Sequence, residues 1–131
     1  MTGYVQNIED ITLTNKNFRQ VLFTARHIQL VVMSIPVGQD IGEETHDLDQ
    51  FLRIEQGQGQ TILNGEKQSI ADGFAVIVPA GTKHNIINTG DQPLKLYSLY
   101  SPPNHRDQIV HQTKEDAMTD DEHFDSHITT T

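Results

Sequence analysis

Four polar side chains in two short segments have the types and spacing needed to bind a metal ion. Glu44, His46 and Gln50 lie close together in GEETHDLDQ, and His84 opens HNIIN. Two imidazoles, a carboxylate and an amide oxygen can coordinate one divalent metal ion such as Fe, Mn, Zn or Ni. Glu44, His46 and His84 alone form the 2-His-1-carboxylate set associated with non-heme iron and its open coordination positions. We therefore expect a mononuclear metal site.

Side-chain alternation along a strand explains how these residues could meet. Glu44, His46 and Gln50 have the same parity and can point into one barrel lumen, which His84 would reach from across the barrel. Each residue has an alternative. His46 could be a solvated loop residue, and Gln50 could hydrogen-bond a metal-bound water instead of the metal. A register shift of one residue would replace Glu44 by Glu43.

Three further residues are candidates for the pocket around this site. Arg53 could point inward to hold an anionic substrate, although an ion pair on the outer face of the sheet is favoured. Tyr97 and Tyr100 differ in parity, so only one of them should face the lumen. An inward tyrosine could act as an acid or fill volume, and we favour the second role.

The elements that must position these residues are short strands separated by turns, which predicts an all-β sandwich or barrel. Asn64-Gly65 is the strongest hairpin signal in the chain. Strand-like runs occupy residues 27–35, 49–56, 60–70, 74–80, 84–88 and 94–101.

The chain divides into three regions by composition. Residues 1–19 should form an N-terminal arm or edge strand, and residues 20–103 the barrel. After a double proline, residues 104–131 form a C-terminal extension, in which Thr113 can N-cap a short helix. The acidic, polar end of this extension predicts a flexible tail.

The spacing of the two segments resembles the conserved motifs of the cupin superfamily. The second motif is matched throughout; in the first, the spacing is kept, but Glu44 stands where the first histidine is usual and Gln50 where a glutamate is usual. The matching positions are Glu44, His46, Gln50 and Gly57 in the first motif, and Gly73, Pro79, Gly81, His84 and Asn88 in the second. The whole chain is similar to small single-domain bacterial cupins of the mannose-6-phosphate-isomerase-like (cupin 2 conserved barrel) group. The resemblance implies a double-stranded β-helix, a jelly-roll barrel, and usually a homodimer.

Composition limits the other partners and the compartment. The formal net charge of −9 argues against nucleic acid and anionic membrane, which both need positive surface. No cysteine is present, so disulfides, thiolate metal ligands and cysteine nucleophiles are excluded for this chain. The first residues lack an apolar signal core, and the longest apolar run is too short and too interrupted to cross a bilayer. We expect a cytoplasmic protein whose partner is a small molecule.

Three functions are compatible with these residues. The first is a dioxygenase-like oxidoreductase that uses the open positions of the metal. The second is a metal-dependent sugar or sugar-acid isomerase or epimerase, for which a phosphosugar is disfavoured because few basic residues lie near the motifs. The third is a non-catalytic module that binds or senses a small ligand, since a fold alone does not establish an activity.

Overall fold

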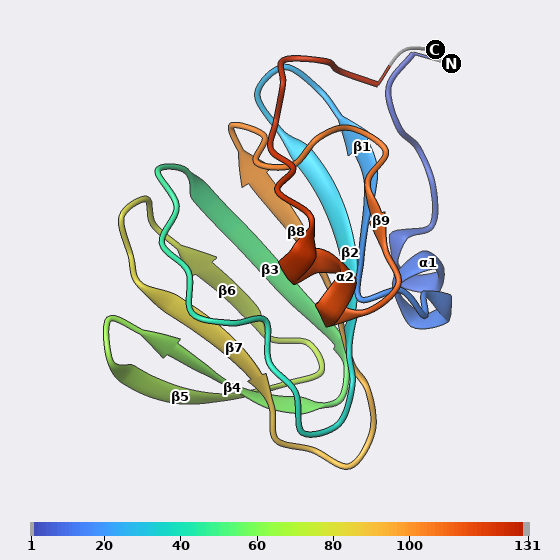
Figure 1. The fold of residues 1–131 in the computed structure, drawn as a ribbon. Coiled ribbons are helices and arrows are strands. Elements are labelled where there is room, and N and C mark those ends of the chain that lie inside the picture. The colour runs from blue at the N-terminus through green and yellow to red at the C-terminus, as the bar shows by residue number, and fades with distance from the viewer. Residues whose placement is uncertain (1, 130–131) are drawn as a thin grey trace.

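The computed structural model describes residues 2–129 and has the predicted all-β architecture (Figure 1). No helix within residues 2–129 has the length and apolar character needed to span a membrane. The elements in chain order are α1 (Ile8–Thr14), β1 (Arg19–Thr24), β2 (Gln29–Ile35), β3 (Asp49–Gln56), β4 (Gln58–Leu63), β5 (Glu66–Ala71), β6 (Ala75–Val78), β7 (His84–Asn88), β8 (Leu94–Ser101), β9 (Val110–His111) and α2 (Lys114–Thr119).

The strands form two antiparallel sheets that enclose the core. The larger sheet has the order β6-β3-β8-β2-β1-β9, and the smaller has the order β5-β4-β7. In Figure 1 the smaller sheet lies at the lower left, beside β3 and β6 of the larger one. The predicted hairpin is confirmed: β4 pairs with β5, and Asn64 and Gly65 between them both have positive φ, as a tight hairpin turn requires.

The register of the larger sheet separates a polar inner row from apolar ones. Tyr100 of β8 pairs with Gln50 of β3 and with Gln29 of β2, and these three side chains are buried. The next inner rows are mainly apolar and contain Leu52, Ser98 and Val31, then Ile54, Leu96 and Met33. One end of the barrel interior is therefore polar, while the remainder is hydrophobic core.

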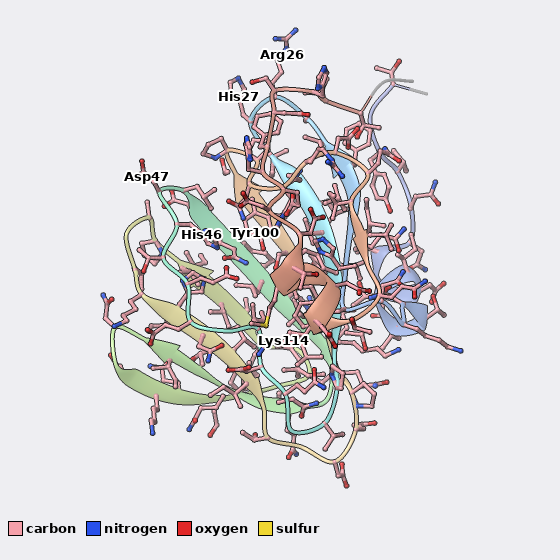
Figure 2. The ribbon with its side chains drawn as sticks, viewed as in Figure 1. Arg26, His27, His46, Asp47, Tyr100 and Lys114 are labelled. Atoms are coloured by element: carbon pink, nitrogen blue, oxygen red, sulfur yellow. The ribbon has the colours of Figure 1, made fainter. Side chains whose placement is uncertain are left out.

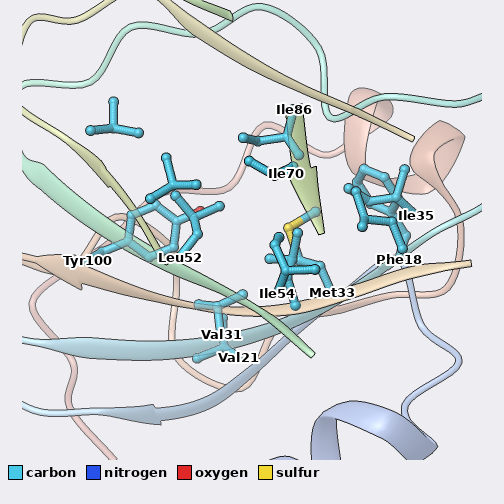
Figure 3. Packing of buried hydrophobic residues seen from close by; sticks show 14 of the residues in the cluster. Phe18, Val21, Val31, Met33, Ile35, Leu52, Ile54, Ile70, Ile86 and Tyr100 are labelled. Atoms are coloured by element: carbon cyan, nitrogen blue, oxygen red, sulfur yellow. The ribbon is translucent and has the colours of Figure 1, made fainter. Parts of the chain in front are cut away.

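The apolar core closes the space between the two sheets (Figure 3). Ile70 and Ile86 of the smaller sheet belong to the same buried cluster as Leu52, Ile54 and Met33 of the larger sheet. Removing these side chains from water is the main favourable term in folding. The packed core fixes the distance between the sheets, and with it the positions of the polar residues at the end of the barrel.

The N-terminal region, for which an arm or edge strand was expected, contains the helix α1 before β1. The Asn7 side chain accepts a hydrogen bond from the backbone N–H of Asp10 at 3.1 Å and so caps the helix. The Nζ atom of Lys95 donates to the carbonyl oxygens of Leu13 and Asn15 at 2.8 and 2.9 Å. Both ends of the helix thus have polar partners, which the composition of this segment did not reveal.

The C-terminal extension contains the predicted helix α2, and Thr113 caps it by accepting from the N–H of Asp116 at 3.1 Å. The residues after α2, where composition predicts a flexible tail, are irregular, and two of their backbone N–H groups contact the barrel region. The N–H of Phe124 donates to the carbonyl of Asn104 at 3.0 Å, and that of Thr129 donates to the carbonyl of Thr24 at 2.8 Å.

Candidate metal centre

The segment that carries Glu44 is fastened to the edge of the smaller sheet. The backbone N–H of Glu44 donates to the carbonyl of His84, and the N–H of His84 donates to the carbonyl of Glu44, each at 2.9 Å. Two residues earlier, the N–H of Gly42 donates to the side chain of Asn85 at 3.0 Å. This pairing makes Glu44 and His84 direct neighbours.

The explanation based on one strand with one parity is wrong. β3 begins only at Asp49, so Glu44 and His46 lie on the irregular segment that crosses from the smaller sheet to the larger one. The carbonyl of His46 accepts from the N–H of Gly81 at 2.8 Å, which holds this segment near the start of β7. Gln50, by contrast, lies on β3 in the larger sheet. The candidate ligands therefore come from both sheets.

Three of the four predicted ligands converge in the structure. One possible ligand atom from each of Glu44, His46 and His84 lies within 4.8 Å of the other two. Nε2 of His46 is 2.7 Å from Oε2 of Glu44, yet no hydrogen bond of acceptable geometry joins these atoms, and Nε2 is buried. Ligands about 2.1 Å from one cation and at right angles to each other would be about 3 Å apart. The close approach without a hydrogen bond suits two ligands that face a common ion.

The imidazole of His84 is oriented by the backbone. It is 5% exposed, and its Nδ1 lies 2.9 Å from the carbonyl oxygen of Thr82. An Nδ1–H that donates to this carbonyl leaves Nε2 with its lone pair free. A hydrogen bond of this kind is what usually fixes the ring of a metal-binding histidine.

Gln50 is the fourth predicted ligand, and it occupies the polar inner row of the larger sheet. The side chain is 4% exposed, and its Nε2 donates to the hydroxyl of Ser98 at 3.4 Å. Its Oε1 atom is buried without a hydrogen-bond partner. A buried amide oxygen without a donor is unfavourable unless another group, such as a cation or its water, completes it. The residues present therefore fit a divalent metal ion.

Glu44 is ionised more readily than an ordinary glutamate. Burial alone would raise its pKa, but the neighbouring His46 outweighs this effect, and Arg19 and His84 act in the same direction, so the pKa is lowered. The carboxylate is thus available as an anionic ligand. It is the only one of the converging ligands that carries a negative charge.

Of the three predicted pocket residues, one faces the barrel interior and two lie on the outer face. Tyr100 is buried in the barrel and its ring packs edge-on against His46, with centroids 6.1 Å apart (Figure 2). Tyr97 has the opposite parity and packs against Phe51 on the outer face, with centroids 6.4 Å apart. Arg53 also faces outward, where its Nε lies 2.9 Å from Oε1 of Glu55. This is the favoured of the two arrangements considered for Arg53.

Two buried ionisable groups from the C-terminal extension line the same region. Nδ1 of His105 lies 2.7 Å from Oε2 of Glu122, and both side chains are less than a tenth exposed. The His105 ring packs edge-on against Tyr100, with centroids 5.1 Å apart. Burial lowers the pKa of His105, although Glu122 opposes this effect. No sequence pattern pointed to this pair, because Glu122 lies in the segment that composition assigned to a loose tail.

Arg19 is the other charged residue that the sequence did not indicate. It is the first residue of β1 and is only 6% exposed, since it pairs with Met33 of the inner apolar row and with His111. An arginine at the start of a strand is normally assigned to the surface. The alternation with buried Val21 on the same strand was the available signal.

Comparison with known proteins agrees with this architecture. Residues 31–100, which include all four candidate ligands, match the model of the cupin domain. The uncharacterized protein YrkC of Bacillus subtilis (strain 168) is 49% identical over 122 residues, which cover 88% of this chain and 66% of YrkC, just under two thirds of that protein.

Solved structures show the same fold. The crystal structure of BH2720 from Bacillus halodurans has a TM-score of 0.88 and 48% identity, and covers 89% of this chain and 94% of that one. A cupin from Methanocaldococcus jannaschii with a double-stranded β-helix fold has a TM-score of 0.66 and 20% identity, covering 78% and 93% of the two chains, and supports the fold alone. The matched domain, the close structural relative and the antiparallel two-sheet barrel together establish that this chain belongs to the cupin family.

Proposed function

We propose that this cupin is a metal-dependent enzyme that acts on a small organic molecule, as a dioxygenase-like oxidoreductase. Glu44, His46 and His84 would hold one divalent metal ion, with Gln50 as a weaker fourth ligand or a hydrogen-bond partner of its water. The observation that carries this proposal is the convergence of three ligand atoms within 4.8 Å. A site with two imidazoles and one carboxylate leaves coordination positions for other molecules.

The ligand residues would have different roles at the metal site. Glu44 contributes the negative charge, and the carbonyl of Thr82 orients His84. The amide oxygen of Gln50 is a weaker donor to such a cation than an imidazole nitrogen or a carboxylate, so Gln50 could give up its position. An Fe or Mn ion bound here would supply redox chemistry and Lewis acidity.

Tyr100 would contribute a hydrogen-bond donor inside the barrel. Burial raises the pKa of its hydroxyl, so this group stays protonated at neutral pH and can donate a hydrogen bond to a bound ligand. The small-molecule partner and the homodimer expected from the family resemblance belong to the same proposal. Light scattering coupled to size-exclusion chromatography would test the homodimer.

A metal-dependent sugar or sugar-acid isomerase or epimerase is the second candidate. The buried pair of His105 and Glu122 beside Tyr100 favours it, because a neutral imidazole can accept the proton that such reactions move. Turnover under argon with Zn²⁺ would support this candidate. Oxygen consumption that needs Fe²⁺ or Mn²⁺ would support the oxidoreductase, and tight ligand binding without turnover would indicate a binding module.

Elemental analysis of the protein purified without a metal-affinity tag is the first test. We expect near-stoichiometric Fe, Mn, Ni or Zn in the wild type and its loss in the His46→Ala/His84→Ala double variant. The matched control is His27→Ala/His123→Ala, which removes two exposed histidines and should retain the metal. A wild-type protein that contains no metal, and takes up none on reconstitution, would contradict the proposal.

A further inference from the structure

A cavity of about 880 Å³ lies at the end of the larger sheet that is opposite the candidate metal centre. Lys95 lines this cavity and stands at the start of β8, whereas Tyr100, which pairs with Gln50, stands near the end of the same strand. A strand rises about 3.3 Å per residue, so about 17 Å separates the two positions on β8. None of the four candidate metal ligands lines the cavity, which is therefore a separate site.

The walls of this cavity are mainly apolar. Phe18 is a buried residue of the core, and Pro36 and Pro93 lie in the loops that follow β2 and precede β8. Met118 of α2 lines the same cavity and is 75% exposed. A ligand that covers these side chains removes apolar surface from water, and the flexible thioether of Met118 can adapt to its shape.

Positive charge is concentrated around these apolar walls. Three of the five lysines in the chain line the cavity, although the formal net charge of the protein is −9. They are Lys16, Lys95 and Lys114, and Glu115 is the one acidic residue among the described residues of the lining. Lys114 forms an ion pair with Asp40. In the described part of the chain, Lys16 and Lys95 have no carboxylate partner.

The ammonium groups of Lys16 and Lys95 are close enough to affect each other. The Nζ atom of Lys95 donates to the carbonyl oxygens of Leu13 and Asn15, which leaves one of its three N–H groups available. Burial and the positive charge of Lys16 both lower the pKa of Lys95. An anion placed between two ammonium groups turns this repulsion into two attractions.

A second cavity of similar size has the opposite charge. Its volume is about 830 Å³, and its described lining contains Glu55, Asp72 and Asp91 but no lysine or arginine. An anion with an apolar body would be repelled there and attracted to the lysines of the first cavity. The two cavities thus differ in the ligand that they favour.

We propose that the cavity lined by Lys16, Lys95, Phe18 and Met118 binds an aliphatic carboxylic acid of medium chain length. The carboxylate lies between Lys16 and Lys95, and the alkyl chain lies against Phe18 and Met118. The volume is within the range of about 300–1,000 Å³ that is usual for small-molecule sites. This site does not need the metal, so the inference goes beyond the function proposed above.

The test measures the binding of octanoate by isothermal titration calorimetry. Butyrate keeps the carboxylate and shortens the chain, octan-1-ol keeps the chain without the charge, and octylammonium reverses the charge. Octanoate should bind at least about tenfold more tightly than butyrate, since two buried CH₂ groups suffice for that factor. It should also bind more tightly than octan-1-ol and octylammonium. Equal or stronger binding of any of these three probes would overturn the proposal.

Two variants at exposed positions test the two parts of the cavity. Lys16→Gln removes one ammonium group, and Met118→Ser removes part of the apolar wall. Each should weaken octanoate binding about 3- to 10-fold. The matched controls are Lys67→Gln and Val5→Ser, which change an exposed lysine and an exposed apolar residue outside the cavity and should keep the wild-type affinity. Wild-type affinity in both cavity variants would contradict the proposal.

The double variant His46→Ala/His84→Ala separates this site from the metal centre. It should bind octanoate as tightly as the wild type, whether or not the wild type contains metal. Loss of octanoate binding in the double variant would assign the carboxylate to the metal centre and overturn the proposal. Light scattering tests a second copy of the chain as the occupant. A molecular mass that falls in Met118→Ser, without octanoate binding to the wild type, would show that the cavity is an interface between copies.

Discussion

Glu44 and His84 exchange two backbone hydrogen bonds of 2.9 Å, so the main chain makes the two candidate ligands direct neighbours. This bridge depends on main-chain atoms and not on either side chain. It anchors the irregular segment before β3 to the start of β7. The irregular segment before β3 can thus hold a carboxylate at a fixed spacing from the imidazole of His84.

His84→Ala should therefore abolish metal binding while the barrel remains folded. The backbone bridge to Glu44 does not need the imidazole, and the variant loses one of the three converging ligand atoms. Elemental analysis measures the metal, and circular dichroism measures the fold. Complete unfolding of the variant would show that His84 has a structural role and would remove the basis of the catalytic proposal.

Gln50→Glu should tighten the binding of divalent metal. The Oε1 atom of Gln50 is buried without a partner, and a glutamate at this position adds a full negative charge to the ligand set. One additional charged contact of about 1.4 kcal/mol corresponds to a tenfold change in Kd, which competition with a chelator can measure. Unchanged affinity would place Gln50 outside direct contact with the metal.

The sequence predicted the strands well because their signals are local. The runs at 49–56, 84–88 and 94–101 agree with β3, β7 and β8, and Asn64-Gly65 marks the hairpin. The parity of Tyr97 and Tyr100 likewise depends only on strand alternation, and the structure has one tyrosine on each face.

Features that depend on tertiary contacts were not predictable in this way. Nothing local indicates that Glu122 folds back onto His105. For the arginine that opens β1, the alternation with Val21 was the one local signal of burial. The spacing of Glu44, His46 and Gln50 identified the right region, but the reason given was wrong, because pairing with β7 and not one continuous strand positions the first two. Burial of a charge is a property of the assembled barrel.

Gly59→Ala should destabilise the barrel by about 1–3 kcal/mol, the usual cost of overpacking. A Cβ at this position would lie 2.6 Å from the carbonyl oxygen of Ile87 and 2.9 Å from Cδ2 of Leu94. The backbone of the paired strand cannot move away without breaking the β4–β7 pairing. Chemical denaturation measures the loss. Gly90→Ala, whose nearest contacts are 3.3 Å or longer, is the control and should lose less; equal losses would contradict the packing argument.

Stability of the metal-free protein should fall as the pH decreases from about 7 to 5. Burial lowers the pKa of His105 below 6.5. In this range His105 therefore binds a proton more readily in the unfolded chain than in the folded protein. Stability therefore rises with pH through the unfolded pKa. The carboxyl of Glu122, whose pKa is lowered mainly by His105 against the opposing effect of burial, adds a loss of the same sign below about pH 4.

The variant His105→Gln isolates this effect, because glutamine can still donate a hydrogen bond to Glu122 but does not titrate. Urea denaturation at several pH values should give a smaller change in the free energy of unfolding between pH 7 and 5 than in the wild type. His27→Gln replaces an exposed histidine and should show the same change in the free energy of unfolding between pH 7 and 5 as the wild type. If His105→Gln shows the same change as the wild type, His105 is not the group that links folding to pH. The buried pair with Glu122 must then be protonated as readily in the folded protein as in the unfolded chain.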